Sequence, residues 1–200
     1  MEASDVAGSD AIAAVGDTLL SLLREEISKQ GLTIALASPG EFDPDSTGLS
    51  LFLYDVTESR DLSNRKPQAR EDGTIVGSAL ALELSYLLTA HPDDDVDHSS
   101  VSESTSHHDA LGEAMTVFRE NAILSGSMLT GSLGDDDRLH ISMDDRTAER
   151  TADVWSTFQE TPYQPSVSYV VAPVIIDTEP EDAAATVEEV ELRYRLGVDR

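Results

Sequence analysis

The amino-acid sequence predicts an α+β fold: a single domain with a mixed β-sheet, packed by about three helices, and an additional C-terminal strand. Three stretches carry apolar residues at steps of three and four, which is the spacing of amphipathic helices. Other stretches are apolar in alternation or in short continuous runs, as strands are. The order of these helices and strands along the chain favours a mixed sheet with helices packed on it.

The length and composition suit one core. The chain has 200 residues, of which 40% are hydrophobic, and this is the size of an ordinary single domain. We expect residues 1–8 to form a flexible N-terminus and residues 9–178 to form the α+β domain. Residues 179–200 are expected to be an acidic linker followed by a C-terminal strand or arm.

The first helix is expected to begin with Ser9 or Asp10 as its cap and to end near Gln30, before Gly31. Its apolar stripe consists of Ile12, Val15, Leu19, Leu22, Leu23 and Ile27. A short strand is expected to follow over residues 32–36.

Residues 49–56 predict a central strand with both faces covered, because their apolar side chains point both ways. The polar residues 57–72 predict an exposed loop. Alternating leucines over residues 80–90 predict a second strand, and the Asp- and Ser-rich residues 91–107 predict a flexible loop.

The second half of the domain adds two helices and two strands. The expected elements are a helix over residues 108–121, a Gly/Ser/Asp-rich loop over 125–137, a strand over 139–143, a helix from Asp144 or Asp145 through Phe158, and a strand over 167–176. The buried side of the second of these helices is expected to be Ala148, Ala152, Val154, Trp155 and Phe158. Pro173 interrupts the last strand and predicts an edge or a bulge there, since proline has no N–H for the ladder. Further on, Val190, Leu192, Tyr194 and Leu196 alternate as one more strand.

The charge is strongly acidic. The formal net charge is −26, and only two of the basic residues are lysines, Lys29 and Lys66. Such like charge weakens a compact state unless salt screens it, and in about molar salt the Debye length falls to roughly 3 Å. We therefore interpret the composition as halophilic. An acidic disordered chain is the alternative, and the apolar periodicities argue against it.

The same composition bears on partners and location. Binding to nucleic acid is not expected, because the basic face that neutralises phosphates is missing. No apolar run reaches the roughly 18 residues of a membrane helix, so no membrane partner is expected. The N-terminus is acidic rather than basic, which predicts a protein that is cytoplasmic at synthesis.

A search for catalytic and metal-binding motifs predicts no enzyme, no cofactor and no metal site. There is no Gly-rich phosphate loop and no nucleophile elbow. His107, His108 and Asp109 lie next to one another, but adjacent helical side chains point about 100° apart and do not converge on one ion. We expect them to be solvated residues at a helix start. The acidic runs at residues 93–95 and 135–137 lack the ligand spacing of a calcium loop.

Four segments together resemble a known family. They are Leu51-Phe52-Leu53-Tyr54-Asp55-Val56-Thr57-Glu58, the run from Leu80 to Ala90 ending in Tyr86-Leu87-Leu88-Thr89-Ala90, the helix His108-Asp109-Ala110-Leu111-Gly112-Glu113-Ala114-Met115, and Trp155 with the stretch from Tyr163 to Asp177. In order and spacing the chain is similar to the cap, or tube-terminating, proteins of extracellular contractile injection systems, which are phage-tail-like particles of the antifeeding-prophage and virulence-cassette type.

The resemblance implies a structural protein that caps the end of the inner tube and sheath distal from the baseplate and stops their polymerisation. It implies three partners: further copies of the chain in a ring, expected to be a hexamer, the inner tube protein and the sheath protein. The particle would be assembled in the cytoplasm and could be released. The candidate assembly contacts are Arg60, Asn64, Arg65, Arg70, Arg193 and Arg195.

Two other readings stay open at this point. A tail terminator or completion protein of a contractile-tailed virus would show the same segments. An acidic ligand-binding protein or enzyme of another class would instead require a concave pocket with convergent polar groups.

Overall fold

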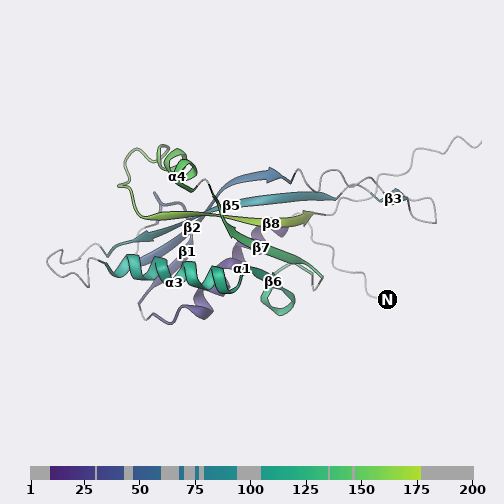
Figure 1. The fold of residues 1–200 in the computed structure, drawn as a ribbon, viewed down its shortest axis with the longest axis horizontal. Coiled ribbons are helices and arrows are strands. Elements are labelled where there is room, and N and C mark those ends of the chain that lie inside the picture. The colour runs from purple at the N-terminus through teal and green to yellow at the C-terminus, as the bar shows by residue number, and fades with distance from the viewer. Residues whose placement is uncertain are drawn as a thin grey trace, which may run out of the picture.

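The protein was examined as a computed structural model, which describes residues 10–29, 31–42, 47–59, 68–69, 75–76, 79–93, 105–134, 136–145 and 147–176. Its elements are α1 (Ala11–Glu26), β1 (Thr33–Leu36), β2 (Gly48–Glu58), β3 (Gln68–Ala69), β4 (Ile75–Val76), β5 (Leu80–His91), α3 (Ser106–Glu120), β6 (Ile123–Ser125), the 3-10 turn η1 (Gly126–Met128), β7 (Arg138–Met143), α4 (Thr147–Trp155) and β8 (Ser166–Ile176). Figure 1 shows the arrangement.

A six-stranded sheet forms the centre of the domain, with the strand order β1-β2-β5-β8-β7-β6. The pair β1/β2 is parallel, and the four other pairs are antiparallel. The strands β3 and β4 form a separate antiparallel pair. This is a mixed sheet with three described helices around it, so the predicted α+β class is confirmed.

The helices cover the two faces of the sheet unequally. The helices α1 and α3 lie on one face, and α4 lies on the other (Figure 1). On the first face, Phe118 of α3 packs edge-on against Tyr169 of β8, with ring centroids 5.0 Å apart. On the second, the indole Nε1 of Trp155 donates a hydrogen bond to Ser166 Oγ over 3.1 Å. Ser166 and Tyr169 are three residues apart on one strand, so they point to opposite faces.

The core lies between the sheet and the pair α1 and α3. Its largest fully buried side chains are Tyr86, Phe118, Leu19, Leu23, Leu49, Leu51, Leu84, Leu88, Leu124, Leu139 and Val15. Burying a leucine or phenylalanine contributes roughly 1.5–3 kcal/mol, so this layer is the main source of stability. The stripe predicted for the first helix is confirmed where it matters most, at Val15, Leu19 and Leu23.

The helix boundaries differ from the sequence prediction. The helix α1 ends at Glu26, four residues before Gln30, and Asp10 stands at its N-cap without a side-chain capping bond. Gly31 instead has a φ of +80° in the turn that leads to β1. The helix α4 stops at Trp155 rather than Phe158.

The buried side of α4 was also partly wrong. Thr151 and Trp155 face the sheet, whereas Ala148 and Ala152 are exposed. Thr151 and Trp155 are an i, i+4 pair on one face of this short helix. Trp155 buries much more apolar area against the sheet than Ala148 or Ala152 could, so its side of the helix faces inward.

The central strands agree with the prediction and extend it. The strand β2 continues to Glu58, so Thr57 and Glu58 are not part of the expected loop. The strand β5 includes His91, which was assigned to the following loop. The strand β6 was not predicted, because three residues are too few to show a period.

Pro173 lies where the prediction placed it, at an irregularity of the sheet. The register of β5 against β8 shifts between Leu82 and Leu84, and Pro173 stands in the unpaired stretch opposite. The Ala172–Pro173 peptide bond is cis. The predicted linker and strand after residue 178 lie outside the described residues, as do residues 1–8.

Candidate functional site

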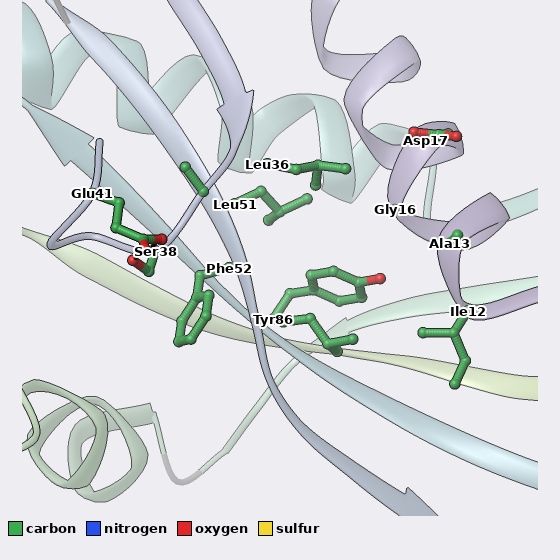
Figure 2. Close-up of a pocket in the computed structure, with 12 residues that line it drawn as sticks. Ile12, Ala13, Gly16, Asp17, Leu36, Ser38, Glu41, Leu51, Phe52 and Tyr86 are labelled. Atoms are coloured by element: carbon green, nitrogen blue, oxygen red, sulfur yellow. Dashed lines mark hydrogen bonds between the residues drawn. The ribbon is translucent and has the colours of Figure 1, made fainter. Parts of the chain in front are cut away.

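An apolar groove runs between α1 and β2, and Figure 2 shows it in close-up. Its volume is about 600 Å³. We call it the α1–β2 groove. Its lining residues are Ile12, Ala13, Gly16 and Asp17 of α1, Leu36, Ala37, Ser38 and Glu41 around the end of β1, Leu51, Phe52 and Leu53 of β2, and Tyr86 of β5.

Gly16 shapes the floor of the groove. A Cβ at this position would lie 3.2 Å from Leu36 Cδ1 and 3.6 Å from the Tyr86 hydroxyl. The glycine therefore lets Tyr86 and Leu36 approach the helix closely. Burial, followed by the nearby Asp17 carboxylate, raises the pKa of the Tyr86 hydroxyl above its ordinary value. Tyr86 is thus a neutral wall of the groove and not an acid or base.

The groove opens onto an uncovered sheet edge. The strand β1 pairs with β2 only from Gly48 to Leu51, and β2 continues to Glu58 with no described strand on that side. We call residues 53–58 on this side the free β2 edge. Val56 on it is 43% exposed, and Leu36 beside it is 41% exposed. Free backbone N–H and C=O groups next to exposed apolar side chains form a template for strand addition.

The two faces of the free β2 edge differ in character. Leu53 pairs with Tyr86 and Val56 pairs with Leu84, so both point to the face covered by α1. Asp55 points to the opposite face, where its carboxylate lies 3.9 Å from Arg150 of α4. The register shift between Leu53 and Asp55 produces this change. Glu58 pairs with Leu82 and so also points to the α1 face, at the end of the edge. The α1 face of the edge therefore carries two apolar side chains followed by one terminal carboxylate, and the opposite face carries Asp55.

The outer edge of β1 is closed by a side chain. Arg24 of α1 donates hydrogen bonds from Nε (3.2 Å) and Nη2 (2.7 Å) to the Ile34 carbonyl oxygen. Thr33 donates its N–H to the carbonyl oxygen of Thr47, just before β2, and Ala37 donates to that of Leu51. Ile34 between them therefore points its backbone groups outward. Arg24 takes the acceptor that an added strand would need.

A line of polar side chains crosses the sheet beneath α4. Tyr54 Oη and Ser168 Oγ are 2.6 Å apart, and Thr89 Oγ1 and Ser166 Oγ are 2.9 Å apart. Ser166 also accepts the hydrogen bond of Trp155. Each of these groups has a partner, so these hydrogen bonds stabilise the packing of α4 on the sheet.

His91 and His107 are buried, not solvated. His91 Nε2 lies 2.8 Å from Ser50 Oγ, and its ring stacks on Phe42 at 4.7 Å. Burial, and then the charge of His107, lower the pKa of His91 to about 4. Burial also lowers the pKa of His107, helped by His108 and Lys29. The expectation that His107 is a solvated residue is wrong, because the start of α3 packs against β2 and β5.

Among the described residues, no group of three or more His, Asp or Glu side chains could hold a metal ion. No helix in the described part of the chain is long and apolar enough to cross a membrane. The six candidate contacts, Arg60, Asn64, Arg65, Arg70, Arg193 and Arg195, all lie outside the described residues.

The α1–β2 groove and the free β2 edge were not predicted from the sequence. Gly16, a glycine inside an apolar helical stripe, was the one local signal of a close approach.

A second hollow of about 500 Å³ lies between α3 and β7. Met115, Phe118, Ile141, Met143 and Tyr169 contribute to its lining, and Met143 is 57% exposed. Arg119 and Ser142 also line it, but most of the lining is apolar. An exposed apolar hollow of this kind has the character of a contact surface.

Comparison with known families gives one extended match. The model of the Pvc16 N-terminal domain matches residues 14–189. A comparison with curated proteins returned no match.

Two solved structures share the fold. One is the sheath/tube terminator of PVC, an extracellular contractile injection system, in its extended state; it is 16% identical, with a TM-score of 0.59 over 94% of this chain and 64% of that one. The other is the tube-terminating cap of the anti-feeding prophage (AFP), 15% identical, with a TM-score of 0.58 over 90% of this chain and 60% of that one. The chain therefore spans less than two thirds of the length of either.

Proposed function

The chain belongs to the family of the Pvc16 N-terminal domain, and from this premise we propose that it terminates the inner tube and sheath of a contractile injection system. The observation that carries the proposal is the match of residues 14–189 to this family. The likeness of its fold to a sheath/tube terminator and to a tube-terminating cap supports it.

The features of the described surface suit a structural role. Two apolar hollows and a free strand edge are present, and the buried polar groups beneath α4 are paired with one another. Such surfaces bind other proteins through apolar area and backbone hydrogen bonds. A role without catalysis is part of the proposal.

The proposed partners are the inner tube protein, the sheath protein and further copies of the chain. A ring of identical heterologous contacts closes when its rotation is right, and it can match the symmetry of the layer beneath it. We propose a hexameric ring. Arg60, Asn64, Arg65 and Arg70 are proposed to contact the partners, because they lie in the sequence between the exposed end of β2 and β4.

The proposal includes a high-salt environment. A net charge of −26 on 200 residues is tolerated when the Debye length is short. Assembly between two such acidic surfaces would otherwise be opposed by their repulsion.

The experiment is reconstitution in about molar salt with purified tube protein. We expect the protein to bind tube ends, to shorten the tubes that form, and to appear as a terminal ring in electron micrographs. A variant with Arg60, Arg65 and Arg70 changed to glutamate should lose tube-end binding, whereas the exposed Arg138→Glu on β7 serves as the matched control. Tubes of unchanged length, with no protein at their ends, would overturn the proposal.

A further inference from the structure

The described structure ends close to the free β2 edge. The strand β8 ends at Ile176, opposite Leu80, and β2 ends at Glu58, opposite Leu82. Both ends therefore lie at the same end of the sheet, with β5 between them. A strand added on the free side of β2 would lie three strand spacings from β8, about 14 Å, so the chain leaves the sheet within easy reach of this edge.

The sequence after Ile176 contains one segment with the period of a strand. Residues 187–197 place Val190, Leu192, Tyr194 and Leu196 on one side. The other side carries Glu189, Glu191, Arg193 and Arg195. An alternating segment of this kind has one apolar and one charged face when it is extended.

The free β2 edge has the complementary faces. Towards α1 it presents Leu53 and Val56 beside the α1–β2 groove, and towards α4 it presents the Asp55 carboxylate. A strand with leucines on one side and two arginines on the other can place its leucines towards α1 and its arginines towards Asp55 at the same time.

We propose that residues 187–197 add to the sheet as a further strand, antiparallel to β2 along residues 53–58 of the same chain. The apolar side chains of the segment cover the mouth of the α1–β2 groove, and Arg193 and Arg195 lie on the opposite face, beside Asp55. A strand that comes from the Ile176 end of the sheet runs back along β2, which sets the antiparallel direction.

The tether decides between the same chain and a second copy. Residues 177–186 can span more than about 30 Å when extended, well above the distance needed. A short flexible tether gives an effective concentration in the range of mM. A strand from another molecule would compete only at a comparable protein concentration.

This inference goes beyond the proposed function and does not depend on it. It assigns Arg193 and Arg195 to the chain's own sheet in the free protein, before any assembly. Failure to bind tube ends would leave it intact, and its own failure would leave the proposed function intact.

Disulfide trapping tests it, because the chain contains no cysteine. Val56→Cys is combined in turn with Leu192→Cys, Tyr194→Cys or Leu196→Cys, and with the out-of-phase Arg193→Cys and Arg195→Cys as controls. We expect an intramolecular disulfide in at least one in-phase variant and at least about tenfold slower trapping in the controls. Adjacent strands bring Cα atoms within the range that a disulfide requires.

A second measurement covers variants that do not cross-link. Hydrogen exchange of the amides of residues 53–58 is followed in the full chain and in the double variant Leu192→Asp and Leu196→Asp. We expect exchange about tenfold faster in the variant, and no change in Glu191→Gln. Trapping only between two molecules, or equal trapping in both phases, would overturn the proposal, as would exchange that is the same in all three proteins.

Discussion

Acid should destabilise the protein through His91, even though acid also neutralises much of its surface charge. The imidazole lies at the end of the inner strand β5, with Nε2 2.8 Å from Ser50 Oγ and its ring tilted against that of Phe42. Its pKa is lowered from 6.5 to about 4 by burial and then by His107. In the unfolded chain the imidazole binds a proton below about 6.5, whereas in the folded chain it binds one only below about 4.

This difference in pKa between the folded and unfolded chain sets the direction and the size of the change in the free energy of unfolding with pH. Between pH 6.5 and 4 the unfolded state binds more protons, so the free energy of unfolding falls as the pH falls. At about 1.4 kcal/mol per pKa unit, His91 accounts for a loss of up to about 3 kcal/mol across this window. The lowered pKa of His107 acts in the same direction.

The assay compares His91→Gln with the wild type by urea unfolding in concentrated salt at a series of pH values. Carboxylate titration is common to both proteins and cancels in the difference. We expect the wild type to lose up to about 3 kcal/mol relative to the variant between neutral pH and pH 4, and His140→Gln, on an exposed side chain, to follow the wild type. A difference between wild type and His91→Gln that stays constant with pH would refute the reasoning.

Three further predictions concern stability. Gly131→Ala should destabilise by about 1–3 kcal/mol, since the residue has a φ of +70° and its Cβ would lie 2.9 Å from Ala14 Cβ; Gly112→Ala in α3, with nothing within 4 Å, should stabilise by about 0.5–1 kcal/mol, and thermal unfolding that ranks the two variants in the opposite order would contradict this. Trp155→Phe should cost about 1–2 kcal/mol, because it leaves Ser166 without its indole donor; a denaturant midpoint equal to that of the wild type would show that the bond contributes nothing. Dialysis into low salt should unfold or loosen the protein, given its charge of −26, and a circular dichroism spectrum and melting temperature unchanged by salt would exclude halophilic adaptation.

The parts of the fold that could be predicted from the sequence are the helices and strands in which the spacing of apolar residues follows the buried face along the whole element. The strands β5 and β8 are long, are paired on both sides, and carry apolar residues throughout. The helix α1 has 16 residues, or just over four turns, and its apolar stripe faces one layer throughout. In these elements the local pattern and the tertiary environment agree, so the pattern suffices.

The parts that were wrong depend on neighbours distant in sequence. The helix α4 buries Thr151 because Trp155 docks onto Ser166 on β8 and sets the rotation of the whole helix. His107 is polar by type but is buried by the packing of α3 against β2 and β5. No local pattern contains either contact.

The candidate site could not be found by motif for a related reason. The α1–β2 groove exists because β1 has four residues and β2 has eleven, so the second strand outruns the first. A difference in strand length leaves no signature in any one segment. Family resemblance, by contrast, was found from segments in β2, β5, α3 and β8, and the match over residues 14–189 confirms it.

The contact between Arg24 and the Ile34 carbonyl limits this side of the sheet to one place where a further strand can pair. Where β1 ends the sheet, the acceptor is already taken by a guanidinium group. Where β2 protrudes, six residues are open, enough for one strand of about 20 Å. A strand added there abuts the end of β1 and extends the sheet no further along that side. A strand on residues 53–58 would therefore leave no second long edge for strand addition on this side of the described sheet.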